Sequence, residues 1–280
     1  MRIIKSEQIT DAVKEMCIKA NCYIDPAIRA SLESALKNEK SEVGKNVIKN
    51  LLRNADIAAQ KEVPICQDTG MAVFFVEIGK DVFVEGANIS KAIEIGVKNG
   101  YKDGYLRKSV VCDPLNRVNS GDDTPPVIHY SFTDGDKIKI TFAPKGFGSE
   151  NKSALKMLNP SDGEQGVIDF VLDTVRKAGA NPCPPMVVGV GIGGTFEKAA
   201  QLSKLALTRS IDIRNTNKCY ADMESKLLSL INKLGIGPQG FGGTTTALGV
   251  NIEYFPTHIA GLPVAVNISC NATRHETVTI

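Results

Sequence analysis

The 280-residue sequence lacks a long apolar run, a strong excess of charge of either sign and a recognisable N-terminal signal. No apolar stretch approaches the roughly 18 residues that a membrane span requires. The net charge is only +2 and the basic residues are scattered, so we expect neither a nucleic-acid-binding face nor a membrane contact. The first residues pass directly into a charged, helical pattern, which predicts a cytoplasmic protein.

The sequence also lacks a local cysteine motif. Its seven cysteines are an odd number, and no spacing among them matches a zinc finger or a ferredoxin. In a cytoplasmic protein this composition argues against a disulfide framework and favours free thiols or metal ligands. Cys17 and Cys22 fall in a helical region, and we expect them to be small buried apolar residues.

Three other cysteines lie where the chain turns. Cys66 and Cys183 are flanked by proline and glycine, and Cys270 lies in a segment rich in glycine and threonine with two of the three histidines. Three such thiolates could converge on one metal centre. On a four-iron cluster they would leave one iron open, able to act as a Lewis acid when a hydroxy acid loses water. Cys112, beside Asp113-Pro114, is a fourth candidate ligand.

The order of the elements predicts a mixed α/β fold in one domain over residues 1–280. Residues 1–62 form a helical portion, in which Ser6, Asp25 and Ser41 begin three amphipathic helices. A mixed α/β portion follows over residues 63–280. In it we expect strands at 71–78, 127–132, 137–142, 186–190, 245–254 and 262–269, and helices at 87–101, 161–178, 195–208 and 217–234.

Two connections in this portion carry specific expectations. The turn residues 133–136 predict that the strands on either side of them form a hairpin. Residues 101–126 read as a long functional loop. The glycine-rich residues 144–152 open a helix, where backbone N–H groups suit an anion, although a tight turn explains them equally well.

Two competing chemistries remain open. The run Gly189-Val190-Gly191-Ile192-Gly193-Gly194 satisfies the dinucleotide-binding pattern, with Asp212 about twenty residues farther on. It lies late in the chain, however, and no βαβαβ series surrounds it. Nucleophilic catalysis by a cysteine with one of the three histidines is the second alternative. Cys66 has an acidic neighbour, rather than the cation that stabilises a thiolate.

A site that dehydrates a hydroxy acid needs donors for carboxylates and a group that exchanges protons. Gln67, Asp68, Arg107 and His258 are residues of the right kinds. For His258 a buried core histidine is an equally good interpretation.

Five motifs stand out when they are taken together. They are CQDTG at 66–70, KGFGSENKSA at 145–154, NPCPP with GIGGT at 181–195, GPQGFGGTTTALGV at 237–250 and SCNATRH at 269–275. In combination they resemble the α subunit of the two-subunit iron–sulfur hydro-lyases, which are the class I fumarate hydratases and the L-tartrate dehydratases. The resemblance extends from the N-terminal helices to the end of the chain.

The resemblance implies a [4Fe–4S] cluster with one open iron, whose ligands are Cys66, Cys183 and Cys270. It further implies a set of residues that bind a small dicarboxylate substrate. These are Gln67, Asp68, Arg107, Gly146, Gly148 and Ser149. Asp68 and His258 are implied as the acid/base pair.

The resemblance also implies a partner. Single-chain members of the family continue into a further domain, which supplies basic substrate-binding residues and a threonine base. We therefore expect a β subunit that completes the site in an αβ or α2β2 assembly. Of the two substrates we expect fumarate, hydrated reversibly to (S)-malate, because that is the commoner metabolic role. Dehydration of tartrate to oxaloacetate is the alternative reaction. The non-enzymatic alternative is a metal-bearing structural or regulatory subunit.

Overall fold

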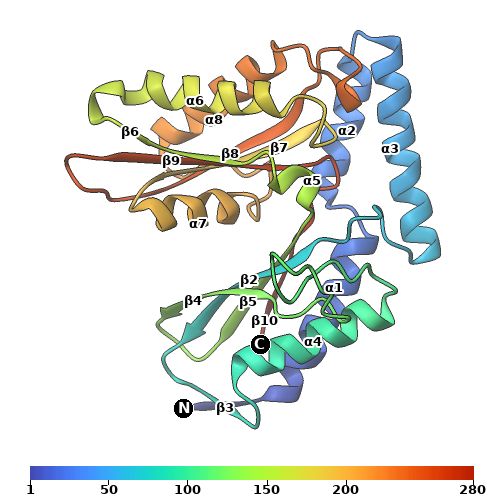
Figure 1. The fold of residues 1–280 in the computed structure, drawn as a ribbon, viewed down its shortest axis with the longest axis vertical. Helices are drawn as coiled ribbons and strands as arrows, with labels where there is room; N and C mark the ends of the chain where they lie inside the picture. Colours follow the sequence, from blue (N-terminus) through green and yellow to red (C-terminus); the bar gives the residue numbers. More distant parts are fainter. The chain divides into compact units, whose positions relative to one another are not determined.

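The computed structural model describes all residues, 1–280, and divides them into two compact units (Figure 1). The first unit consists of residues 1–24, 55–147 and 274–280, and the second of residues 25–54 and 148–273. Each unit contains a four-stranded sheet and flanking helices, which confirms the predicted mixed α/β class. None of the helices combines the length and the hydropathy needed to cross a membrane.

The first unit is built on a sheet with the strand order β10–β5–β2–β4. These strands are β2 (Met71–Gly79), β4 (Val127–Thr133), β5 (Ile138–Lys145) and β10 (Glu276–Thr279). Helices α1 (Ser6–Cys22) and α4 (Ile89–Asp103) pack against each other, and α1 also lies against β5 and β10. The short strands β1 (Arg2–Lys5) and β3 (Val82–Glu85) form a separate parallel pair.

The contact between α1 and α4 is unusually close. A Cβ atom at Gly96 would lie 2.7 Å from Cβ of Val13, and one at Gly100 would lie 2.7 Å from Cβ of Cys17. The absence of side chains at these two glycines therefore lets the helices approach. Cys17 is fully buried in this contact, as its position on the apolar stripe of α1 predicts.

The predicted hairpin around residues 133–136 is wrong. Strand β2 lies between β4 and β5, parallel to the first and antiparallel to the second. The chain that follows β2 bonds to the turn itself: the N–H of Lys80 donates to the carbonyl of Thr133 at 2.9 Å, and that of Asp81 to Gly135 at 2.9 Å. The turn at 133–136 therefore crosses the end of β2 and does not join two paired strands. The turn residues alone could not indicate that a strand remote in sequence lies between β4 and β5.

The second unit is built on a sheet with the strand order β6–β9–β7–β8. These strands are β6 (Ala154–Leu158), β7 (Met186–Gly193), β8 (Ala247–Phe255) and β9 (Leu262–Ser269). Helices α6 (Gly163–Ala178) and α8 (Lys218–Asn232) cover one face, and α7 (Phe196–Ala206) covers the other (Figure 1). Strand β7 is central, parallel to β8 and antiparallel to β9.

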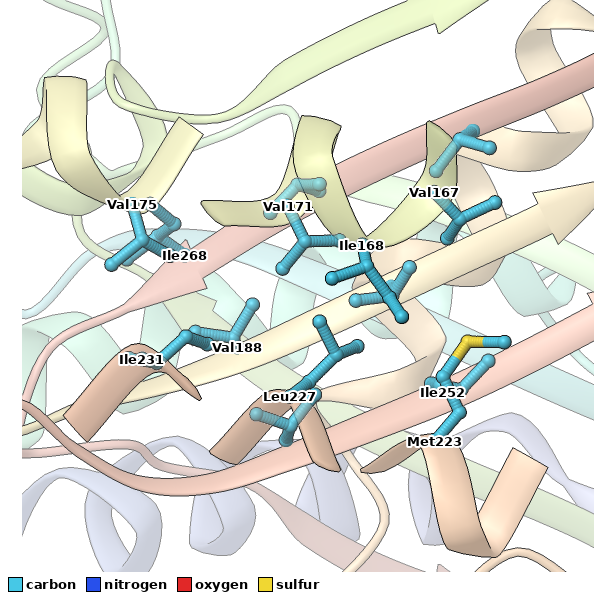
Figure 2. Packing of buried hydrophobic residues seen from close by; sticks show 14 of the residues in the cluster. Val167, Ile168, Val171, Val175, Val188, Met223, Leu227, Ile231, Ile252 and Ile268 are labelled. Carbon is cyan, nitrogen blue, oxygen red and sulfur yellow. The ribbon is translucent and has the colours of Figure 1, made fainter. Parts of the chain in front are cut away.

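Alternation along the central strand divides its side chains between the two faces. Figure 2 shows Val188 of β7 in the apolar layer between the sheet and helices α6 and α8, with Val171 and Leu227 from those helices. The next residue, Gly189, faces α7, where a Cβ would lie 2.1 Å from the carbonyl oxygen of Ser203. The glycines of β7 thus allow a helix to lie directly on the strand.

The remaining helices are α2 (Pro26–Asn38), α3 (Glu42–Lys61), the single turn α5 (Phe147–Glu150) and the 3₁₀ turns η1 (Pro160–Asp162) and η2 (Pro238–Gly240). Two of the three predicted N-caps are confirmed. Asp25 Oδ1 accepts from the N–H of Ala27 at 2.8 Å, and Ser41 Oγ accepts from the N–H of Gly44 at 3.1 Å. Ser6 is instead the first helical residue, and its hydroxyl accepts from Ala87 N–H at 3.2 Å.

A buried carboxylate holds the connection between α2 and α3 to a glycine-rich loop of the same unit. Glu39 is 2% exposed and accepts hydrogen bonds from the backbone N–H groups of Lys40, Ser41, Thr244 and Thr245, at 2.8 to 3.0 Å. Burial by itself would raise the pKa of this carboxyl. The backbone donors outweigh burial and lower the pKa to about 2.

We expect Glu39→Gln to lower the free energy of unfolding by about 2 kcal/mol at pH 7, because hydrogen bonds to an ionised acceptor are lost. The depressed pKa means that the contribution of Glu39 is present above its ordinary pKa of 4.5 and is lost as the pH falls towards 2. Urea unfolding at a series of pH values measures both effects. Glu33→Gln, an exposed change on the preceding helix α2, is the matched control, and equal stability of the two variants at pH 7 would refute the role of Glu39.

Candidate active site

The first predicted ligand, Cys66, lies in a loop of the first unit between α3 and β2. The N–H of Ile65 donates to the carbonyl of Asn21 on α1 at 2.9 Å. The guanidinium of Arg274 donates to Asn21 Oδ1 at 2.7 Å and to the carbonyl of Asp68 at 2.9 Å. Arg274 is only 7% exposed, so a buried charge anchors this loop to α1. The sequence placed Arg274 in a recognised motif without indicating this role.

The side chain of Asp68 joins two of the predicted motifs. Its Oδ1 accepts from the N–H of Gly70 at 3.1 Å, and its Oδ2 accepts from the N–H of Phe147 at 2.9 Å. A Cβ atom at Gly146 would lie 3.1 Å from the same Oδ2. Gly146 therefore admits the carboxylate, and both carboxylate oxygens face backbone donors. The structure thus brings together Asp68 and the first residue of the predicted substrate loop.

Arg107 is held beside Asp68 by its backbone. Its N–H donates to Thr69 Oγ1 at 2.9 Å, and the same hydroxyl donates to the carbonyl of Arg107 at 3.2 Å. The side chain of Arg107 is exposed and has no hydrogen-bond or ion-pair partner. Gln67 is also exposed, and its Oε1 accepts from the thiol of Cys66 at 3.3 Å. Five predicted site residues of the first unit, Cys66, Gln67, Asp68, Arg107 and Gly146, are therefore neighbours.

The second unit brings together the other two predicted ligands. The carbonyl of Cys183 accepts from the side-chain amide of Asn271 at 2.7 Å and from its backbone N–H at 3.3 Å. Cys183 precedes β7 and Cys270 directly follows β9, and these strands are antiparallel. Both cysteines therefore lie at one end of the sheet. The adjacent carbonyl of Pro184 accepts from the backbone N–H of Gln239 at 2.7 Å, which adds the glycine-rich loop to this end.

The rest of the predicted substrate loop is tied to β9. Glu150 forms an ion pair with Lys204 and accepts from the side-chain amide of Asn267 at 3.0 Å. Ser149 is buried, and a Cβ atom at Gly148 would lie 4.0 Å from the carbonyl oxygen of Asn181. Gly148 and Ser149 therefore lie at the same end of the sheet as Cys183.

The structure separates His258 from this group. Residues 256–261 connect β8 to β9, and Thr257 Oγ1 donates to the carbonyl of Gly194 at 2.8 Å, at the far end of β7. A strand of this length spans roughly 25 Å, so His258 and Cys183 lie at opposite ends of the sheet. The imidazole is exposed, and its Nδ1 accepts from the N–H of Ala260 at 3.2 Å. The alternative interpretation of a buried core histidine is therefore wrong.

The seven cysteines divide by exposure. Cys17 and Cys22 are buried, and burial raises the pKa of each thiol, with further contributions from Asp123 and Glu62 respectively. A buried neutral thiol is a poor metal ligand, because the thiolate is the ligating form. Cys66 and Cys270 are half-buried and Cys183 is exposed, all on loops.

Cysteine thiolates of the kind found on these loops are the usual ligands of iron–sulfur clusters. No group of three or more His, Cys, Asp or Glu side chains is arranged around one point to hold a metal ion. In a four-iron cluster each cysteine binds a different iron, so the ligands need not share one centre. Three accessible loop thiols suit that arrangement. Cys112 and Cys219 are also exposed, so exposure alone does not identify the ligands.

The dinucleotide interpretation of the glycines in β7 is not supported. A Cβ at Gly191 would lie 2.1 Å from the carbonyl oxygen of Ala199, so this glycine serves the packing of α7. The first turn of α7 carries Glu197, which accepts from Thr195 Oγ1 at 2.6 Å. An acidic side chain at this helix end opposes a phosphate.

The comparisons with known proteins agree with these motifs. A family model described as Fumarate hydratase (Fumerase) matches residues 10–279. A protein of Methanocaldococcus jannaschii, whose name assigns it provisionally as an L(+)-tartrate dehydratase subunit alpha, is 45% identical over 273 residues, which cover 95% of each chain. The L(+)-tartrate dehydratase subunits alpha of Escherichia coli O157:H7 and K12 are 35% and 34% identical over 277 residues, which cover 98% of this chain and 91% of theirs.

Proposed function

The chain belongs to the Fumarate hydratase (Fumerase) family, and we propose that it is the α subunit of an iron–sulfur hydro-lyase that converts L(+)-tartrate to oxaloacetate and water. The observation that carries this proposal is the contact of Asn271 with Cys183, which places two of the three candidate cluster ligands at one end of a sheet. The third, Cys66, lies beside the candidate substrate-binding residues of the first unit.

The choice of substrate departs from the expectation of fumarate. That expectation rested on the commoner metabolic role and not on any residue. The relatives that match almost the whole chain carry the name of tartrate dehydratase subunits. Reversible hydration of fumarate to (S)-malate becomes the second candidate, supported by the description of the family model.

We assign the cluster to Cys66, Cys183 and Cys270. When bound, a [4Fe–4S] cluster with three protein ligands supplies a Lewis-acidic iron for the hydroxyl and a carboxylate of the substrate. Arg274 holds the loop of Cys66, and it follows Cys270 by four positions in the sequence.

The residues around Cys66 would bind and orient the substrate. The exposed guanidinium of Arg107 suits a carboxylate, and the amide of Gln67 suits a hydroxyl. The glycine-rich loop at Gly146, Gly148 and Ser149 would receive a second carboxylate, and the N–H of Phe147 in this loop donates to Asp68. Asp68 is our candidate to take a proton from the substrate or a bound water, and the N–H groups of Gly70 and Phe147 hold its carboxylate in place.

We propose that His258 serves the site of a second copy of the chain. Within one chain it lies a strand length away from Cys183 and Cys270, so it cannot act beside them. This role requires an α2β2 assembly in which the exposed loop 256–261 of one copy lies beside the cluster of another. A β subunit, implied by the names of the relatives, would complete each site.

The ligand assignment predicts a pattern of thiol protection. Reconstituting the cluster should protect Cys66, Cys183 and Cys270 from alkylation by N-ethylmaleimide under anaerobic conditions, because ligated thiolates do not react. Cys112 and Cys219 should react equally with and without the cluster, and Cys17 should stay unmodified in the folded protein. Peptide mass spectrometry reads all sites in one sample.

Serine variants complete this test. Replacing any of the three assigned ligands should abolish cluster retention, measured by visible absorption, while Cys219→Ser should retain it. Protection of Cys112, or loss of the cluster from Cys112→Ser, would overturn the assignment.

The substrate assignment predicts a preference for tartrate by the complex with the β subunit. We expect its kcat/KM for L(+)-tartrate dehydration to exceed that for fumarate hydration by at least about tenfold, because a site that bonds the second hydroxyl discriminates against a substrate without it. Anaerobic assays of both reactions with the same preparation measure the ratio. Faster turnover of fumarate would reverse the assignment, and full activity of the isolated chain would remove the need for a partner.

The placement of His258 predicts that two inactive variants complement each other. His258→Asn and Cys270→Ser should each be nearly inactive as uniform assemblies. Coexpression should restore up to about a quarter of the wild-type activity, since in mixed dimers one site combines an intact cluster with an intact histidine. No recovery in assemblies shown to be mixed would place His258 outside the reaction.

A further inference from the structure

The long loop 104–126 of the first unit encloses a buried carboxyl group that the proposed mechanism does not use. Asp123 is 0% exposed. Its Oδ1 accepts from the backbone N–H groups of Ser109 at 2.6 Å and Val110 at 3.2 Å. Its Oδ2 is buried and has no hydrogen-bond partner. A carboxyl in such a place is costly, which suggests that its contacts serve a purpose.

The groups that face Asp123 come from several elements of the same unit. Besides burial, the charge of Asp123 raises the pKa of Cys17 on α1 and of Tyr101 on α4, and the carboxylate of Asp68 raises the pKa of Asp123. Arg274 has the opposite effect on the pKa of Tyr101. Burial raises the pKa of Asp123 to about 7, despite the opposing backbone hydrogen bonds and with a smaller contribution from Asp68.

Thr69 and Asp123 together bind the backbone of residues 107–110, an arrangement that we call the clamp on Arg107. Thr69 binds both the N–H and the carbonyl of Arg107, and Tyr101 in turn fixes Thr69, because its hydroxyl donates to the carbonyls of Gly70 at 2.8 Å and Thr69 at 3.2 Å. Asp123 holds the backbone two and three residues after Arg107. The backbone is thus fixed at Arg107 and immediately beyond it, while its guanidinium is exposed.

We propose that Asp123 is a positioning residue, which together with Thr69 fixes the backbone of residues 107–110 and so aims Arg107 at a carboxylate of the substrate. This inference rests on the proposed function in that it takes Arg107 as the anion contact. Asp123 itself touches no substrate. It acts through the two amides that it accepts from, so the acceptor oxygen and not the negative charge is what matters.

Three variants of the complex with the β subunit separate these properties. Asp123→Ala removes the acceptor, and Asp123→Asn keeps it while removing the charge. Asp113→Ala is the matched control, because Asp113 accepts from Leu115 and Asn116 N–H in the same loop but is only half-buried.

We expect Asp123→Ala to raise the KM for the dicarboxylate about tenfold or more, with kcat within about threefold and the cluster absorption unchanged. Hydrogen exchange of the Ser109 and Val110 amides should accelerate by a similar factor. Asp123→Asn and Asp113→Ala should match the wild type in both measurements. If Asp123→Ala does not fold, Thr69→Val, which removes the hydroxyl that binds Arg107, should raise the KM in the same way. Thr69→Ser keeps the hydroxyl and should have the KM of the wild type.

A second readout concerns the pH. Since the pKa of Asp123 in the fold, about 7, lies above its ordinary 3.8, its stabilising contribution is complete below pH 3.8 and is lost as the pH rises through 7. Urea unfolding of Asp123→Asn should lack this loss, and an unchanged pH profile would show that the carboxyl does not titrate in the fold.

The outcomes distinguish this inference from the proposed function. Faster exchange with an unchanged KM would make Asp123 a structural cap of the loop and overturn the positioning role. Unchanged exchange in Asp123→Ala would show that the clamp does not exist. If the wild type turns over neither tartrate nor fumarate, the proposed function fails, while the exchange measurement still decides whether the clamp forms.

Discussion

The proposed site depends on two hydrogen bonds from Asn271 to the carbonyl of Cys183. They join the loop before β7 to the loop after β9, so that two cysteines far apart in sequence share one end of a sheet. Cys183 has a left-handed backbone, with φ of +54°, which few residues other than glycine adopt without strain. The contact with Asn271 helps hold this conformation.

Three buried ionisable side chains likewise fix loops, because each of them bonds to the backbone of a loop. Glu39 holds the glycine-rich loop of the second unit, Arg274 holds the loop of Cys66, and Asp123 holds the residues after Arg107. For Glu39 and Arg274, which carry a charge, such bonds are stronger than those between neutral groups, and at all three positions losing one leaves a buried donor or acceptor unpaired. Loops that carry chemistry are thereby fixed without the support of a strand or a helix.

Much of the fold could be predicted from the sequence, because it depends on local patterns. The caps at Asp25 and Ser41 and the buried strand β7 are of this kind. The hairpin prediction failed because the partner of each strand was β2, which is remote in sequence. Arg274 and Asp123 escaped notice because their partners are backbone groups that no motif displays. The substrate preference rested on no residue, and the relatives now favour tartrate.

The most direct test of the central claim is the content of iron and labile sulfide per chain after anaerobic purification, with the absorption spectrum recorded before and after exposure to air. The account predicts about four of each per chain, with visible absorption that bleaches in air as an open iron is lost. Zinc in place of iron, or no metal after anaerobic reconstitution with iron and sulfide, would contradict it.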